Sequence, residues 1–284
     1  MPSGEELNVY YSHYSYTKEV QIPKSTARSI NATLKMLRRM AGKKNLIFLD
    51  FGCGQGDVVL IARDLGFSAY GFEVSKAAVE RCSERGVPLL SLSQIENMKF
   101  DVVTAYEVVE HLARPSETLL LLSDILCNEG ILYLTTPNSN SLSNRRGRLS
   151  SLLYPEHLTL FSKHAISIFA PRYGFSVVDV KTEGLKSQFL LSLRDSVSDF
   201  PKDHRVELGE NCYSEKFFVK PRCGTSARIE SWHIVNVGSM FKESAFYILL
   251  GSKKLINFIL TLLDVGETLK VTLRKVNTSR CAVE

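Results

Sequence analysis

Three glycines and two acidic residues in the first third of the chain have types and spacing suited to nucleotide binding. The run D-F-G-C-G-Q-G occupies Asp50–Gly56, and Glu73 closes the next apolar run. Glycine has no Cβ, so a ligand can lie directly against the backbone of such a turn. A carboxylate in the position of Glu73 can accept hydrogen bonds from both hydroxyls of a ribose. We therefore predict that a nucleoside-containing cofactor binds at Asp50, Gly52, Cys53, Gly54, Gly56 and Glu73.

The spacing of the glycines separates this cofactor from the commoner nucleotides. Dinucleotide-binding enzymes carry G-x-G-x-x-G, whereas this chain carries G-x-G-x-G, and no P-loop lysine and serine follow the glycines. The carboxylate of Asp50 would repel a pyrophosphate, but it suits an ammonium group, directly or through water. The pattern therefore favours a cofactor with an ammonium group and disfavours NAD and nucleoside triphosphates.

Two glutamates and two histidines form a second group with chemical potential. Glu107-x-x-Glu110-His111 follows a later apolar run, and His157 lies in P-E-H-L. If the first stretch is helical, positions three and four apart share a face, so both carboxylates and the imidazole can converge. His157 would then enter from a neighbouring loop. Since histidine has an unperturbed pKa of roughly 6.5, His111 and His157 are the candidates for a general base.

The same four residues leave two alternatives open. Two carboxylates and two histidines can hold a divalent cation such as Mg²⁺ or Mn²⁺, which makes Glu107, Glu110, His111 and His157 an alternative metal site. Residues of these types can also only brace a helix or line a pocket. We assign no metal from the sequence and keep the two histidines as the catalytic candidates.

An alternation of apolar runs and helical patterns must position these groups. Strands are predicted at 46–50, 68–73, 87–92, 100–106, 130–136, 175–180 and 268–276, with helices at 25–40, 58–65, 75–86, 115–126 and 164–173. This alternation is typical of an α/β protein with a mostly parallel sheet, here of seven strands, and helices on both faces. Tyr106 ends the fourth strand at the carboxyl edge, where ligands lie in such sheets, so we expect it beside the cofactor.

Four stretches resemble the motifs of class I S-adenosylmethionine-dependent methyltransferases, in particular the type 11/12 and ubiquinone-biosynthesis subgroup. They are FLDFGCGQGD (48–57), YGFEVS (70–75), FDVVTAYEVVEHLARP (100–115) and GILYLTTPN (130–138). The resemblance covers roughly Asn45 to Val180. It implies a Rossmann-like fold, S-adenosylmethionine as cofactor with Glu73 on its ribose, and in-line methyl transfer to an oxygen, nitrogen or carbon of an acceptor.

Three further stretches resemble bacterial methyltransferases encoded with surface-polysaccharide enzymes: YYSHYSY (10–16), PEHLTLFS (155–162) and VGETLKVTLRK (265–275). They favour O-methylation of a small molecule or a glycan, such as a sugar or a lipid-linked intermediate. The E-x-x-E-H stretch also resembles small-RNA 3′-end 2′-O-methyltransferases, so metal-assisted methylation of an RNA ribose is an alternative. A non-catalytic scaffold that binds the cofactor is a third hypothesis.

The amino-acid composition limits the kinds of binding partner and the cellular location that we expect. The 284 residues are 44% hydrophobic with a formal net charge of +5, a mild excess that predicts no DNA partner and argues against RNA. The six cysteines are scattered without a C-x-x-C pair, the first residues carry no signal-peptide pattern, and no apolar run is long enough to span a bilayer. We therefore expect a cytoplasmic protein. The sequence does not predict the oligomeric state.

The predicted organisation has four parts. They are an N-terminal lid and helix (1–44), a cofactor-binding core (45–185), an insert on the substrate side (186–266) and a final strand with the tail (267–284). Tyr10–Tyr16 is either a lid over the cofactor or a packing arm. Arg145, Arg146 and Arg148 either bind a phosphate or carboxylate of the acceptor or lie in a solvated loop. The apolar Ala245–Leu263 is either a helix pair or a peripheral membrane contact.

Overall fold

The structure, a computed structural model, describes residues 22–145, 157–184 and 260–276, which belong to one compact unit of the chain. The strands are β1 (Ile47–Phe51), β2 (Ser68–Phe72), β3 (Phe100–Tyr106), β4 (Leu126–Pro137), β5 (Phe175–Glu183) and β6 (Thr268–Lys275). The helices are α2 (Lys24–Ala41), α3 (Asp57–Asp64), α4 (Lys76–Glu84), α5 (Leu92–Glu96), α6 (Pro115–Ile125), α7 (Leu142–Arg145) and α8 (Lys163–Phe169). Two 3₁₀ turns, η1 (Val109–His111) and η2 (Ala170–Tyr173), complete the set.

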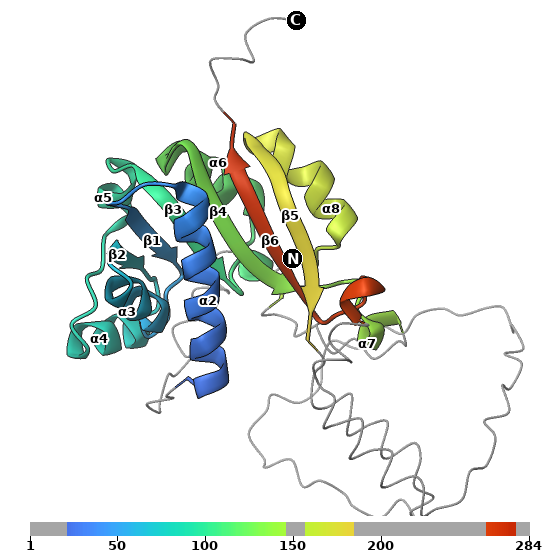
Figure 1. The fold of residues 1–284 in the computed structure, drawn as a ribbon, viewed down its shortest axis with the longest axis horizontal. Coiled ribbons are helices and arrows are strands. Elements are labelled where there is room, and N and C mark those ends of the chain that lie inside the picture. Colours follow the sequence, from blue (N-terminus) through green and yellow to red (C-terminus); the bar gives the residue numbers. More distant parts are fainter. Residues whose placement is uncertain (1–21, 146–156, 185–259, 277–284) are drawn as a thin grey trace, which may run out of the picture. The chain divides into compact units, whose positions relative to one another are not determined.

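One mixed sheet carries the fold, with the strand order β2-β1-β3-β4-β6-β5. β2, β1, β3 and β4 pair in parallel, and β6 is antiparallel to both of its neighbours, β4 and β5. Figure 1 shows β6 inserted between two strands that precede it in the sequence. The carboxyl ends of β1, β3 and β4 therefore meet at one edge of the sheet, where ligands bind in such folds. The predicted α/β, Rossmann-like, mostly parallel fold is confirmed.

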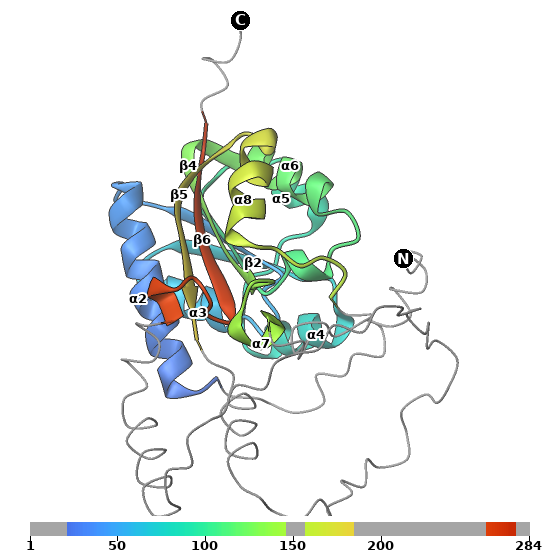
Figure 2. The same cartoon turned by 90° about the vertical axis from the view of Figure 1, so that its right-hand side faces the viewer.

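Helices cover both faces of this sheet, as the edge-on view of Figure 2 shows. One face packs against α2, α3 and α4, and the buried side chains of α2 are Ile30, Leu34 and Leu37. The other face packs against α5, α6 and α8, with Leu122 and Ile166 among the buried residues. The central strand β4 is buried along most of its length because both of its faces are covered, which explains its nearly continuous apolar run.

The prediction of a strand at Val87–Leu92 is wrong, and the described residues form six strands rather than seven. This segment makes only an isolated bridge, in which Leu89 faces Gly71 of β2. Gly71 N–H donates to Pro88 O at 2.9 Å, and Leu90 N–H donates to Gly71 O at 2.9 Å. Pro88 has no N–H of its own to extend the ladder, and the capping box of Ser91 begins α5 directly afterwards.

Several predicted regions lie outside the described residues. They are Tyr10–Tyr16, the arginines Arg146 and Arg148, residues 186–259 of the predicted insert at 186–266, and most of Ala245–Leu263. The four-part organisation therefore stays a prediction. Among the described helices, none combines the length and the apolar character needed to cross a membrane.

Asn138 joins the end of β4 to the turn before β6. Its side-chain Nδ2 donates to Gly266 O at 2.8 Å, and its Oδ1 accepts the N–H of Asn140 at 3.0 Å. Its own backbone N–H donates to Glu267 O at 2.8 Å. Because Asn138 is buried, these bonds are shielded from water and fix the carboxyl edge of the sheet between β4 and β6.

The substitution Asn138→Ala should lower the free energy of unfolding by about 1–3 kcal/mol, because a buried carbonyl loses its donor. Asn97→Ala is the matched control, since Asn97 donates a 2.7 Å bond to Ser93 O on the exposed surface, and it should stay within about 0.5 kcal/mol. Urea denaturation of both variants measures the difference. Equal losses would mean that Asn138 does not hold the sheet edge.

Candidate active site

The glycine loop after β1 adopts a backbone that requires glycine. Gly52, Gly54 and Gly56 have φ angles of 75°, 53° and 82°, in the left-handed region. A Cβ added at Gly52 would lie 2.6 Å from Val108 Cγ2, and one added at Gly56 would lie 2.5 Å from Val87 Cγ2. The loop at the carboxyl edge of β1 therefore needs glycine at Gly52 and Gly56, because neighbouring side chains occupy the positions of their Cβ atoms, and α3 begins directly after it.

Glu73 lies against this loop. Its Oε2 accepts the N–H of Gly54 at 2.8 Å, and its Oε1 accepts those of Val74 and Ser75, each at 2.8 Å. These backbone bonds fix the carboxylate beside the glycines. A carboxylate has roughly four lone-pair sites, so acceptor capacity remains for the hydroxyls of a ribose. The loop and Glu73 thus fit the nucleoside end of a cofactor.

Asp50 is buried one residue before the end of β1. Its side chain is 2% exposed, and Thr104 Oγ1 on β3 donates to Asp50 Oδ1 at 2.6 Å. Burial raises the pKa of Asp50 to about 7, opposed by the Thr104 hydrogen bond and reinforced by the charge of Glu73. The carboxylate therefore favours any positive charge that binds nearby, because such a charge lowers its pKa again.

Tyr106 ends β3 on the α2 side of the sheet. Its ring packs on that of Tyr133 with centroids 5.6 Å apart, within the cluster that also holds Leu34 and Leu37 of α2. Burial, Tyr133 and the charge of Asp50 raise the pKa of the Tyr106 phenol. Tyr106 thus belongs to the same face as Asp50, and its contact with a cofactor stays a prediction.

The stretch after β3 is a strained turn followed by a 3₁₀ turn and not an α-helix. Glu107 has a φ of 51°, which is unfavourable for a residue with a side chain. Its N–H donates to the backbone oxygen of Thr135 and to the hydroxyl Oγ1 of the same residue, each at 3.1 Å. These bonds from β4 hold the turn and send the chain into η1.

The structure brings Glu110, His111 and His157 together. The backbone oxygen of Glu110 accepts the N–H groups of Leu158 at 2.7 Å and Thr159 at 3.1 Å, which docks the His157 segment on η1. The rings of His111 and His157 meet edge to face with centroids 4.9 Å apart. One ligand atom from each of the three side chains lies within 4.8 Å of the other two. Glu107 is not part of this group.

Glu110 is fully buried in the middle of this cluster. Neither carboxylate oxygen has a well-oriented hydrogen-bond donor among the described residues, and His111 Nε2 lies 3.9 Å from Oε1. Burial and the neighbouring carboxylate of Glu107 raise the pKa of Glu110 to about 8, against smaller opposite effects of its own backbone N–H and of Thr136. A proton or a cation held between the side chains of this cluster would offset that burial.

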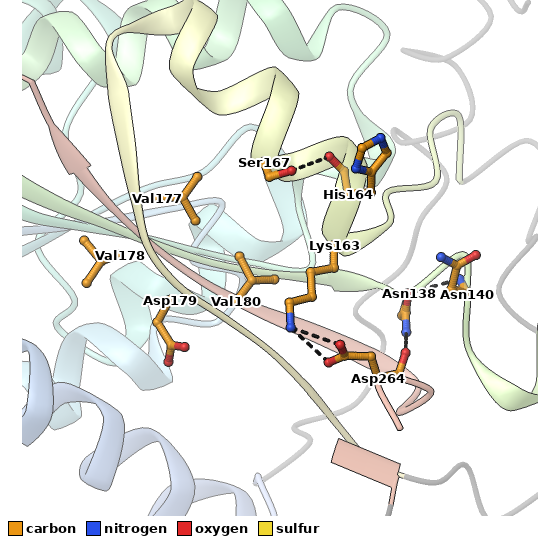
Figure 3. Close-up of a pocket in the computed structure, with 10 residues that line it drawn as sticks. All are labelled: Asn138, Asn140, Lys163, His164, Ser167, Val177, Val178, Asp179, Val180 and Asp264. Atoms are coloured by element: carbon orange, nitrogen blue, oxygen red, sulfur yellow. Dashed lines mark hydrogen bonds and ion pairs between the residues drawn. The ribbon is translucent and has the colours of Figure 1, made fainter. Parts of the chain in front are cut away.

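A separate cavity of about 620 Å³ lies between α8 and β5, and Figure 3 shows the residues that line it. Lys163 on α8 reaches across it to Asp264, with an ion pair of 3.0 Å. Asn138 and Asn140 border the cavity where β4 ends. None of the predicted site residues lines it. The sequence gives no signal for it, because Lys163 and Asp264 come together only through the pairing of β6 with β4 and β5.

The glycine loop, Glu73 and the sheet order together define the class I S-adenosylmethionine-dependent methyltransferase fold. The sequence profile of a methyltransferase-domain family matches residues 25–180, which is more than half of the chain. The chain therefore belongs to this family, and its cofactor is S-adenosylmethionine. The glycine loop, with its left-handed backbone, and the carboxylate of Glu73 that accepts the N–H of Gly54 fit this cofactor.

Three known proteins illustrate the relationship. A ubiquinone biosynthesis O-methyltransferase of Caulobacter vibrioides is 31% identical over 106 residues, 34% of this chain and 42% of that protein. The mitochondrial ubiquinone biosynthesis O-methyltransferase of Candida albicans is 30% identical over 137 residues, 43% of this chain and 42% of that protein. The chain thus matches less than half the length of these curated relatives. The crystal structure of an S-adenosylmethionine-dependent methyltransferase from Archaeoglobus fulgidus is 16% identical, with a TM-score of 0.51 over 88% of this chain and 94% of that chain.

The substitution Asp50→Asn should change the pH dependence of stability. Folding raises the pKa of the Asp50 carboxyl from 3.8 to about 7. The protonated carboxyl therefore stabilises the fold fully below pH 3.8, and this stabilisation is lost as the pH rises from 3.8 through about 7. The neutral amide of the variant has no such loss. The free energy of unfolding of the variant should therefore rise relative to the original protein between these two pKa values and level off above them.

Urea denaturation at several pH values across this window measures the difference. A constant difference at every pH would show that Asp50 titrates in the folded protein as it does in the unfolded chain.

Proposed function

We propose that this chain transfers the methyl group of S-adenosylmethionine to a hydroxyl oxygen of a small molecule or a glycan. The observation that carries the proposal is the position of the histidine cluster beside the glycine loop. The side chain of Val108 occupies the position that a Cβ of Gly52 would need. The three residues after Val108 form the η1 turn with Glu110 and His111. A cofactor on the loop and an acceptor at the histidines would then be neighbours.

The cofactor supplies a methyl group on a positively charged sulfur, which an oxygen nucleophile attacks in line. The chain has to hold the acceptor and take up the hydroxyl proton as the oxygen attacks. His111 or His157 accepts this proton on a ring nitrogen. The buried Glu110, 3.9 Å from His111 Nε2, stabilises the imidazolium that forms. A positive charge there also lowers the pKa of Glu110, so proton uptake by histidine and ionisation of Glu110 favour each other.

The finer parts of the proposal come from similarity. Both curated relatives are named as O-methyltransferases, which supports an oxygen acceptor. The stretches at 155–162 and 265–275 support a sugar or a lipid-linked acceptor. We keep a cytoplasmic location and a peripheral membrane contact as part of this proposal. Leu262 and Leu263, the described end of the apolar stretch Ala245–Leu263, are 67% and 63% exposed.

A metal-assisted version is the second candidate, with a ribose hydroxyl of RNA as one acceptor. It is favoured by the three ligand atoms of Glu110, His111 and His157, which lie within 4.8 Å of one another. In that version, these side chains would hold a divalent cation that lowers the pKa of the acceptor hydroxyl. The mild net charge argues against a large RNA substrate.

The substitution Glu73→Ala should weaken binding of S-adenosylhomocysteine and S-adenosylmethionine by about 10- to 150-fold, because hydrogen bonds to a charged group are lost. Glu80→Ala, an exposed position on α4, is the matched control and should bind both ligands like the original protein. Isothermal titration measures both affinities, with circular dichroism to verify the fold. Unchanged affinity in Glu73→Ala, or tight binding of NAD by the original chain, would contradict the assignment of the cofactor site.

The histidine cluster is tested by turnover. An acceptor is first selected from catechols, phenols, monosaccharides and short RNAs by transfer of a labelled methyl group. His111→Ala or His157→Ala should then lower kcat about a hundredfold or more while cofactor affinity changes little. His164→Ala is the control, since His164 lines the separate cavity. Near-normal kcat in both cluster variants would exclude a histidine base.

Treatment with EDTA distinguishes the two versions of the proposal. Loss of turnover that Mg²⁺ or Mn²⁺ restores supports the metal-assisted version, because a cation in the Glu110, His111 and His157 group would be removed. Unchanged turnover would contradict the metal-assisted version and support the version in which a histidine acts as general base.

A further inference from the structure

We propose that Cys53 and Cys82 form a redox-sensitive dithiol, in which oxidation to a disulfide reversibly weakens cofactor binding. This inference rests on the proposed cofactor site at the glycine loop. Cys53 lies inside that loop, between Gly52 and Gly54, and Cys82 lies on α4. Both are free cysteines and both are buried, with 7% and 0% of their surface exposed.

The two sulfurs converge on one backbone atom. Cys82 Sγ lies 3.2 Å from the carbonyl oxygen of Gly54, and Cys53 Sγ lies 3.9 Å from the same oxygen. The two thiols are also close enough for each to shift the pKa of the other. The pair therefore links the centre of the glycine loop to α4 through weak thiol contacts.

The position of Gly71 on β2 determines how much space the sulfur of Cys53 has. A Cβ added at Gly71 of β2 would lie 2.6 Å from Cys53 Sγ, so glycine at this position makes space for the sulfur. The N–H of Cys53 donates to Phe72 O at 3.0 Å, which anchors its backbone to the end of β2. The sulfur of Cys53 is thus held at a fixed place facing α4.

The two thiols differ in their pKa. The neighbouring thiol of Cys53 and the charge of Arg85 lower the pKa of Cys82, whereas the partner thiol and burial raise the pKa of Cys53. The thiolate is the nucleophile of cysteine oxidation. The lowered pKa favours Cys82 as the thiol that attacks the oxidant first, and either order of attack gives the same disulfide.

The oxidant is a peroxide. Cys82 thiolate attacks one oxygen of hydrogen peroxide, the O–O bond breaks, and a sulfenic acid and water result once a proton is taken up. The sulfur of Cys53 then attacks the sulfenic sulfur, an S–S bond forms, and a second water leaves with the thiol proton. In sum, two thiols and one peroxide give one disulfide and two waters. A small oxidant reaches the pair when the loop opens locally in the cofactor-free protein.

The disulfide changes the loop that carries the cofactor. Its S–S bond of about 2.05 Å draws the loop and α4 together, and the carbonyl of Gly54 loses the thiol proton of Cys82. The N–H of the same Gly54 donates to Glu73 Oε2 at 2.8 Å. Any displacement of Gly54 therefore also displaces the carboxylate proposed to bind the ribose.

The test uses the full chain. The protein is treated with hydrogen peroxide, remaining thiols are blocked with iodoacetamide, and non-reduced peptides are analysed by mass spectrometry for a Cys53–Cys82 link. Isothermal titration with S-adenosylhomocysteine follows before oxidation, after oxidation and after dithiothreitol. We expect the link, an affinity about tenfold weaker or more after oxidation, and recovery on reduction. Bound S-adenosylhomocysteine should slow the formation of the link.

Two variants complete the design. Cys82→Ser should show the same affinity before and after peroxide, and Cys127→Ser, a half-buried cysteine on β4, should respond like the original protein. Absence of the link, a link with unchanged affinity, or a peroxide effect that persists in Cys82→Ser would each overturn the inference. If the reduced protein does not bind S-adenosylhomocysteine at all, the proposed cofactor site fails, and the mass measurement still decides whether the disulfide forms.

Discussion

The close packing around the glycine loop is the constraint on which the rest of the site depends. Gly52 and Gly56 leave no space for a side chain, since Val108 and Val87 occupy the positions that a Cβ would need. The loop is thereby fixed between the segment that leads into η1 and the segment beside β2. Because Val108 directly precedes η1, the residue that packs on the cofactor loop also leads into the turn that carries Glu110 and His111.

The electrostatics of the carboxyl edge follow from buried acids. Asp50 and Glu110 are both removed from water, and burial is the largest cause of the raised pKa of each. Glu73, by contrast, has three backbone N–H groups on its carboxylate. An edge with two buried acids of raised pKa favours cationic ligands, because a nearby positive charge lowers those pKa values again, and a sulfonium with an ammonium group is such a ligand. The same property makes the edge unfavourable for the phosphates of a dinucleotide.

Local sequence patterns predicted most helices and strands. The predictions were wrong where a long-range contact or a neighbouring residue determines the local structure. Apolar periodicity located α2 and the strands of the sheet because each buries one or both faces within its own sequence window. The pattern at Val87–Leu92 also reads as a strand, but Pro88 and the capping box at Ser91 stop the pairing after one bridge. The strained φ of Glu107 had no signal in the residue type, since the bonds to Thr135 that impose it come from β4.

The candidate site divides in the same way. The glycines were predictable because a turn with left-handed φ angles favours residues without a Cβ. The place of Glu73 beside this turn was predictable from its position at the end of the next apolar run. Thr104 was not, since its bond to Asp50 depends on the register between β1 and β3. Cys82 also gave no signal, because its contact with the loop depends on how α4 packs.

The burial of Glu110 connects both versions of the proposed chemistry. An acid with no well-oriented donor among the described residues destabilises the fold when it ionises, so its position is unfavourable for stability alone. Two histidines are nevertheless held against it, one through η1 and one through the bonds from Glu110 O to Leu158 and Thr159. A proton accepted by a histidine and a divalent cation offset the buried charge in the same manner. In the proposed reaction, a positive charge at this point would offset the ionised Glu110, and the acceptor hydroxyl is the group whose deprotonation that charge would assist.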